Sequence, residues 1–143
     1  MSAVKDQATS VTRQQVPENE RSEFLPARVG MYYLPFEFYL YDVASDQSNY
    51  LGGHWEFYSL SNGGWYLAPD SGTFEVSCPN GYSGQLSEDA FGIAFSLIAI
   101  NHLLWQVHRK DPDLGRKLHD AFYALRDYAC EHKEAAEILG VID

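Results

Sequence analysis

The chain has 143 residues, enough for one domain whose core can form without a metal or a disulfide. Apolar residues make up 45% of it and charged residues 21%, which excludes an intrinsically disordered chain. Ten Lys and Arg against 20 Asp and Glu give a formal net charge of −10, and no Lys or Arg occurs from residue 29 to residue 108. Because a protein that grips phosphates needs a basic face, we expect no direct binding of duplex DNA.

The N-terminal segment, residues 1–16, is polar and unpatterned, so we expect a flexible lead-in followed by one folded domain over residues 17–143. The first residues lack the apolar stretch of a secretory signal, and Cys78 and Cys130 form no metal-binding spacing. These features predict free thiols and a cytoplasmic protein.

The first predicted elements are a short apolar segment and a helix. Residues 24–30 read as a short apolar anchor that ends at a breaker, Gly30. Pro35 suits the first turn of a helix, and the apolar residues after it follow helical spacing. We therefore expect a short amphipathic helix up to Asp46.

Two hairpins follow. Residues 54–60 and 65–68 alternate as strands around Asn62-Gly63, a dipeptide that predicts a type I′ turn with two positive φ angles. Residues 73–78 and 82–86 flank Pro79-Asn80-Gly81, which is another turn signal. Four short strands in sequence predict an antiparallel four-stranded meander.

The C-terminal half is helical. Ser87 is a good N-cap, and residues 90–107 are apolar nearly all round, which predicts a buried core helix. This stretch is too short and too interrupted by polar residues for a membrane span. Asp111-Pro112 starts another helix, and residues 134–139 form a last one. The fold class predicted is α+β, a single domain with a meander packed by three to four helices.

Motifs for catalysis or metal binding are missing. His102 and His108 are six residues apart and do not share a helix face. His54 and Glu56 share a strand face without a third ligand, so we expect a cross-strand polar pair. No nucleophile motif frames a serine, and Cys78 reads as a small buried residue. We expect no catalytic residue, no metal and no cofactor.

The aromatic residues of the first hairpin leave two alternatives open. Strand geometry sends Trp55 and Phe57 to one face and Glu56 and Tyr58 to the other. Either both sets are buried, or the second set is exposed and contacts a partner. For the second alternative, the expected partner-binding residues are Glu56, Tyr58, Tyr66 and Asp70.

Residues 52–70, GGHWEFYSLSNGGWYLAPD, are more particular than a hairpin requires. This string resembles the signature of the ArdB/KlcA-type antirestriction family of plasmids and other mobile elements. Three further matches are Phe24-Leu25-Pro26 with Gly30, SEDAFGIAFSL at residues 87–97, and LRDYA at residues 125–129 with His132, Glu134, Ala135 and Ala136. The resemblance extends over residues 24–143. Met31-Tyr32-Tyr33 departs from it, because the relatives carry basic residues there.

The resemblance implies a cytosolic protein that relieves type I restriction of incoming DNA without a cofactor. The expected partner is a type I restriction-modification enzyme, contacted directly or indirectly by a monomer or weak homodimer away from any membrane. We expect a non-catalytic inhibitor. The alternative is a small hydrolase or ligand-binding domain of a mobile element.

The acidic charge is too dilute for an imitation of DNA. Surface scaling gives a 16.2 kDa monomer about 7,500 Å², or about one net charge per 750 Å², whereas duplex DNA carries about one per 100 Å². The acids between residues 29 and 108 are also scattered over a predicted helix, the strands and a helix cap. We therefore expect that the protein is not a DNA mimic.

Overall fold

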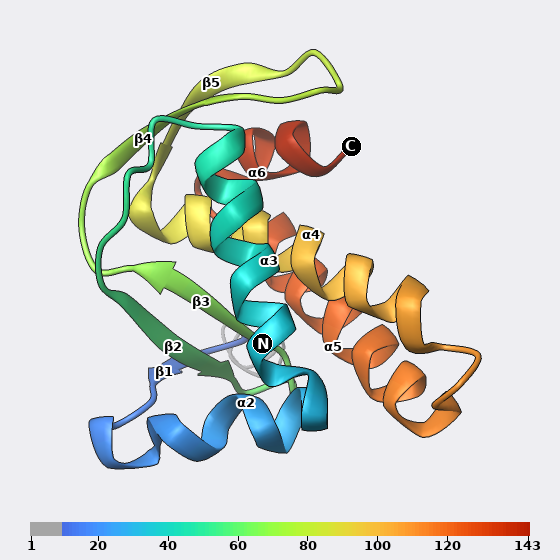
Figure 1. Cartoon of the computed structure of the whole chain (residues 1–143). Helices are drawn as coiled ribbons and strands as arrows, with labels where there is room; N and C mark the ends of the chain where they lie inside the picture. The colour runs from blue at the N-terminus through green and yellow to red at the C-terminus, as the bar shows by residue number, and fades with distance from the viewer. Residues whose placement is uncertain (1–9) are drawn as a thin grey trace, which may run out of the picture.

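The computed structural model describes residues 10–143, which form two small antiparallel sheets and five α-helices (Figure 1). The elements are, in chain order, β1 (Arg13–Gln15), η1 (Glu18–Glu20), α2 (Arg21–Val29), η2 (Gly30–Tyr32), α3 (Tyr33–Asp46), β2 (Trp55–Leu60), β3 (Trp65–Pro69), β4 (Thr73–Ser77), β5 (Ser83–Ser87), α4 (Glu88–Val107), α5 (Pro112–Cys130) and α6 (Ala135–Ile142). The predicted α+β class is confirmed.

The N-terminal lead-in differs from the prediction where it is described. Residues 1–9 of the expected flexible segment lie outside the described residues. Strand β1 pairs antiparallel with β2, and the Val16 side chain is buried. The folded part therefore begins before residue 17, because the backbone of β1 completes an edge that β2 leaves open.

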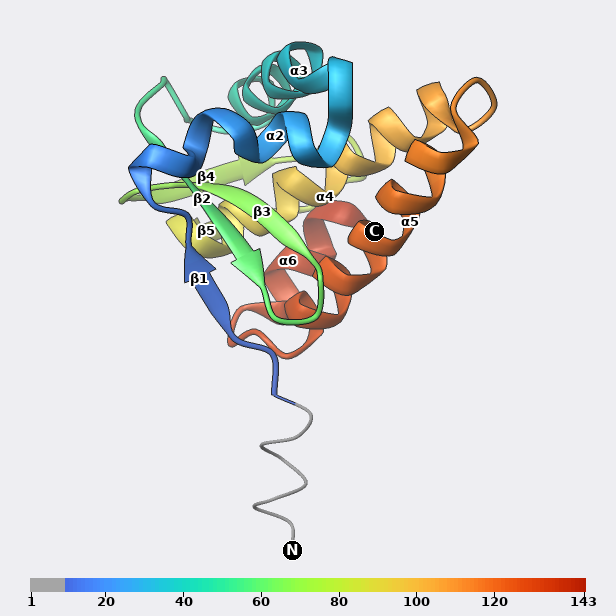
Figure 2. The same cartoon turned by 90° about the horizontal axis from the view of Figure 1, so that it is seen from below.

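The two predicted hairpins exist but do not form one meander. One sheet has the order β1-β2-β3, and β4-β5 make a second sheet. The outer side of β4 pairs with the segment after α3, through a bridge between Ser48 and Val76. Figure 2 shows α2 and α3 on one side of the β1-β2-β3 sheet, with α5 and α6 on the other.

The turn of the first hairpin is not type I′. Gly63 has a φ of 93°, but no residue other than glycine has a positive φ in the described chain, so Asn62 does not. This pattern is that of a three-residue loop with a glycine bulge. The Asn62 side chain instead accepts from Gly64 N–H and donates to the Ala124 carbonyl of α5, which ties the turn to that helix.

Helix α2 was missed by the sequence reading. The sequence predicts residues 24–30 only as a short apolar anchor and assigns no helix to them, whereas α2 begins at Arg21 and contains Pro26. Its buried Phe24 packs on Phe57 and Trp65 of the first sheet, and this packing outweighs the backbone hydrogen bond that the proline removes.

Helix α4 is the centre of the core. Its predicted N-cap is confirmed, because the Ser87 hydroxyl accepts from Ala90 N–H. The helix is long and apolar enough to cross a membrane by those two criteria alone, but 67% of its most apolar window is buried inside the fold. The prediction of a buried core helix is therefore confirmed.

Helix α4 also covers the free edge of β3. The Ser96 hydroxyl accepts from Leu67 N–H at 3.0 Å and donates to the Leu67 carbonyl at 3.1 Å. A β-carbon on Gly92 would come within 2.5 Å of the Leu67 carbonyl oxygen and closer still to Ala68. The helix can therefore approach the strand only because residue 92 has no side chain.

Candidate functional site

The first hairpin, where the sequence placed partner contacts, has both aromatic sets buried. Trp55 and Phe57 pack against the core. On the opposite face, Tyr58 and Tyr66 stack at a centroid distance of 5.1 Å and are covered by Arg13 and Tyr128. The first of the two alternatives therefore holds, and a partner cannot reach the rings of Tyr58 and Tyr66 in this conformation.

The two acidic residues of the predicted partner set have different surroundings. Glu56 accepts from Arg21 and Gln15, and its second oxygen lies 2.8 Å from His54 Nε2. The predicted polar pair of His54 and Glu56 thus forms along one chain segment, not across strands. Asp70 is exposed just after β3. Partner contact through Glu56 and Asp70 stays a prediction.

A cluster of polar side chains joins four distant segments around Asp89. One oxygen of this carboxylate accepts from Arg13 at 2.6 Å and from the Tyr66 hydroxyl at 2.7 Å. The other oxygen lies 2.8 Å from His132 Nε2. Because Glu134 N–H donates to His132 Nδ1, the imidazole carries its proton on Nε2 and donates it to Asp89. The cluster connects β1, β3, the start of α4 and the segment after α5.

Sequence reading missed this cluster, because its members are far apart in the chain. Burial alone would raise the pKa of Asp89, but hydrogen bonds from His132 and Tyr66 and the charge of Arg13 lower it below its ordinary value. Burial and the neighbouring Asp89 charge raise the pKa of Tyr66. Asp89 is therefore ionised and Tyr66 neutral at pH 7, a state in which every contact in the cluster pairs a donor with an acceptor.

We expect Asp89→Asn to destabilise the protein by about 1–3 kcal/mol at pH 7, because the amide faces three donors with one acceptor. A carboxylate with a depressed folded-state pKa contributes stability above its unfolded pKa of about 3.9, and this is lost as the pH falls through the folded value. The free energy of unfolding, measured with urea between pH 2 and pH 7, should fall less steeply toward acid pH for the variant than for the wild type. Equal slopes for both proteins would contradict this role of Asp89.

The cluster has no arrangement for nucleophilic catalysis. Ser87 donates its hydroxyl to Glu134, and among the described residues no hydrogen bond joins it to His132. No group of three or more His, Cys, Asp or Glu side chains within residues 10–143 is placed to hold a metal ion. The polar groups bind one another, so what the cluster does chemically is fasten β1 and the C-terminal segment to the core.

Both cysteines, together with His102 and His108, have ordinary surroundings. Cys78 is buried, as predicted, and Cys130 is exposed; both thiols are free. Burial raises the pKa of the Cys78 thiol, which disfavours the nucleophilic thiolate. His102 stacks on Tyr39 at 3.8 Å, and His108 lies at the end of α4.

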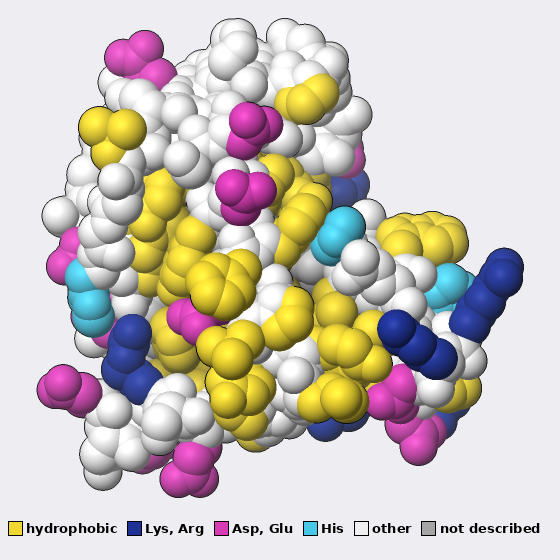
Figure 3. Space-filling view, viewed as in Figure 1, with side chains coloured by type: hydrophobic (Ala, Val, Ile, Leu, Met, Phe, Trp, Pro, Cys, Tyr) yellow, Lys and Arg dark blue, Asp and Glu magenta, His cyan; other side chains and the backbone are white. Residues whose placement is uncertain are grey.

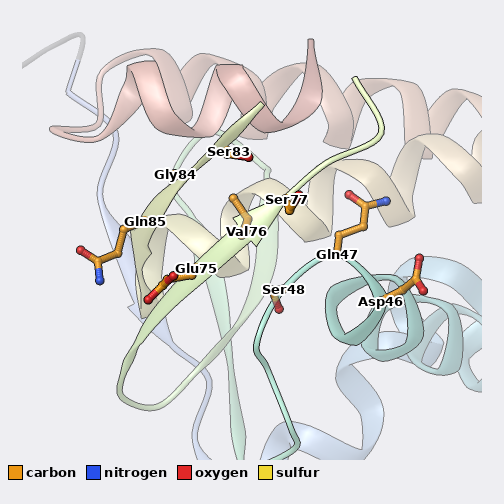
Figure 4. Close-up of a pocket in the computed structure, with 9 residues that line it drawn as sticks. All are labelled: Asp46, Gln47, Ser48, Glu75, Val76, Ser77, Ser83, Gly84 and Gln85. Atoms are coloured by element: carbon orange, nitrogen blue, oxygen red, sulfur yellow. The ribbon is translucent and has the colours of Figure 1, made fainter. Parts of the chain in front are cut away.

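A polar groove of about 830 Å³ lies between the end of α3 and the β4-β5 hairpin (Figure 4). Figure 4 shows Asp46 and Glu75 on opposite sides of it, with small side chains such as Ser48, Ser77 and Ser83 between them. The Asp46 and Glu75 carboxylates make no hydrogen bond or ion pair with any of the residues 10–143. The groove is therefore acidic and open to solvent.

Exposed apolar side chains gather on one face of the molecule. Figure 3 shows hydrophobic side chains over α2 and α3, with acidic side chains farther along α3. Met31, Leu34 and Phe38 are 82%, 50% and 72% exposed. Their spacing of three and four residues was available in the sequence as a second apolar stripe, opposite the buried Phe36 and Leu40.

Comparison with known proteins gives a consistent picture. A protein-family model described as antirestriction protein matches residues 48–143. An antirestriction protein KlcA of Escherichia coli is 36% identical over 137 residues, which cover 93% of this chain and 95% of that protein. Another Escherichia coli KlcA is 43% identical over 97 residues, and the chain spans 64% of its length.

The likeness extends to a solved structure. The KlcA and ArdB proteins of that structure show a novel fold and antirestriction activity against type I DNA restriction systems in vivo but not in vitro. It matches this chain with a TM-score of 0.84 at 37% identity, over 94% of this chain and 96% of the other. Fold and sequence therefore agree over nearly the whole length.

Proposed function

Because the chain belongs to the antirestriction protein family, we propose that it relieves type I restriction of incoming DNA in the cytoplasm. The observation that carries this proposal is the agreement in fold and sequence with KlcA and ArdB, whose reported activity is against type I systems. The alternative of a small hydrolase or ligand-binding domain is not favoured by these relatives. The test is whether the gene raises plating of unmodified phage on a type I restricting host.

The protein acts as a binding inhibitor and not as an enzyme. The support is chemical: the histidine and carboxylates that come together, His132, Asp89 and Glu134, are bonded to one another and to structural groups. A general base needs a free site beside it for the proton of a substrate. No nucleophile is activated by these groups among residues 10–143.

The protein inhibits the restriction enzyme either by direct contact or through another cellular component. For KlcA and ArdB, activity in vivo but not in vitro favours a component that the purified assay lacks. Glu56 and Asp70 remain proposed contacts, and Asp70 is the more accessible of the two. Duplex DNA is not proposed as the partner, since residues 29–108 contain no Lys or Arg that could neutralise phosphates.

The inhibitor does not imitate DNA. The surface of 8098 Å² carries a net charge of −10, about 800 Å² per net charge against about 100 Å² for duplex DNA. Several acids are also neutralised by contacts within the fold: Asp89 by Arg13, and Glu56 by Arg21.

Neutralising four exposed acids, Glu18, Glu20, Asp120 and Glu131, to their amides should leave antirestriction unchanged. The reason is that surface contact, not total charge, carries the function in this proposal. Relief of restriction is measured for the variants with one, two and four substitutions, after thermal unfolding has confirmed that each is folded. A DNA mimic would instead lose activity in step with the number of charges removed.

A further inference from the structure

The exposed side of η2 and α3 is one continuous surface, here called the α3 face. It is made by Met31, Leu34, Phe38, Asp42 and Asp46, which recur every three or four residues. The fifteen steps from Met31 to Asp46, at a rise of about 1.5 Å each, give the face a length of about 22 Å. Its first half is apolar and its second half is acidic, as Figure 3 shows.

The apolar half is unusual for a surface. Four of the seven exposed large hydrophobic side chains of the described chain lie between residues 31 and 38. The opposite side of α3 already supplies the core through Phe36, Leu40 and Ala44, so the exposed stripe is not needed for folding. Clustered Met, Leu and Phe side chains of this kind are typical of the centre of a protein interface.

The acidic half is free to bind cations. Asp42 and Asp46 are exposed and form no ion pair with any of the residues 10–143, in contrast with Glu56 and Asp89. No Lys or Arg lies between residues 29 and 108 to neutralise them. The groove that follows α3 adds Glu75 to the same end of the face.

We infer that the α3 face docks an amphipathic helix of a protein partner, with apolar residues on one half and Lys or Arg on the other. This rests on the proposed function, because a restriction enzyme must grip DNA phosphates and so carries cationic segments. Apolar anchors spaced along a helix are a recurrent recognition mode, and the charges at one end fix its direction.

A second copy of this chain fits the face less well. Two α3 faces in parallel would bring Asp42 and Asp46 against their own counterparts. In the antiparallel arrangement, the acidic end of one copy would bury its charges against Met31 and Leu34 of the other. Both arrangements are unfavourable, because buried charges need opposite charges beside them.

The experiment compares plating of unmodified phage on a type I restricting host for the wild-type chain and three variants. Met31→Ser/Phe38→Ser removes two anchors, and each central anchor is expected to weaken binding about 30-fold. Asp42→Lys/Asp46→Lys repels a cationic segment. Leu51→Ser is the matched control, since Leu51 is 97% exposed and outside the face. Thermal unfolding checks that all four proteins are folded.

We expect the wild-type chain and Leu51→Ser to relieve restriction, and the other two variants to lose this activity. If the wild-type chain relieves restriction and Met31→Ser/Phe38→Ser relieves it equally well, the proposal that the α3 face is a docking surface is wrong. If only Asp42→Lys/Asp46→Lys keeps full activity, the proposal that the partner segment is cationic is wrong. A dimer that dissociates in the Met31→Ser/Phe38→Ser variant, measured by sedimentation, would assign the face to self-association instead. Absence of relief from the wild type would contradict the proposed function itself, and the inference with it.

Discussion

Gly92→Ala is expected to lower the free energy of unfolding by about 3 kcal/mol or more, although alanine favours helices over glycine by about 1 kcal/mol. The added methyl group would overlap with backbone atoms of β3, namely Ala68 Cα and the Leu67 carbonyl oxygen. Backbone atoms cannot rotate away as a side chain can. Relief of the overlap requires α4 to move off the strand, and this would break both hydrogen bonds of Ser96 to Leu67.

Gly115→Ala is the matched control for this prediction. It is the same substitution in helix α5, where the new methyl group would lie 3.1 Å from His108 Cα and needs only a small shift. The higher helix propensity of alanine offsets the cost of that shift, so we expect little net change in the free energy of unfolding. For Gly92→Ala the melting temperature should fall by about 10 °C. Equal melting temperatures for the two variants would contradict the close packing of α4 on β3.

The helices were predictable because their signals are local. Ser87 and Asp111 cap α4 and α5 as expected, and the apolar periodicity between the caps is long. Helix α2 was missed because Pro26 and Gly30 argue against a helix locally, while the packing that stabilises it comes from Phe57 and Trp65, far along the chain.

The division of the strands into two sheets was not predictable from local signals. Each hairpin is encoded by its own turn, but nothing in residues 70–72 says whether β3 and β4 pair. Whether β3 and β4 pair depends on two other segments. Residues 47–49 pair with the outer edge of β4, and the Ser96 hydroxyl forms hydrogen bonds with the outer edge of β3. Both are long-range contacts.

The polar cluster could not be predicted for the same reason. Arg13, Tyr66, Asp89 and His132 are separated by at least 23 residues along the chain, as the Tyr66–Asp89 bond shows. The match of LRDYA with His132 marked that residue as a family feature without giving it a partner. The apolar stripe of Met31, Leu34 and Phe38 was visible in the sequence, but its exposure was not.

Expression of the chain is expected to raise the plating of unmodified phage on a type I restricting host toward the level reached by modified phage. The reason is that relief acts on cleavage of unmodified DNA alone, so modified phage define full plating in the same cells. A host without the restriction system shows whether expression changes phage growth in any other way. Gly92→Ala, which is expected to be poorly folded, is the inactive protein control.

The ratio of unmodified to modified phage plating, with and without the gene in the restricting host, tests the central claim most directly. The claim predicts that the gene raises this ratio, that Gly92→Ala raises it less, and that plating on the host without restriction stays the same. An unchanged ratio with the protein confirmed soluble and folded in those cells would contradict antirestriction by this chain.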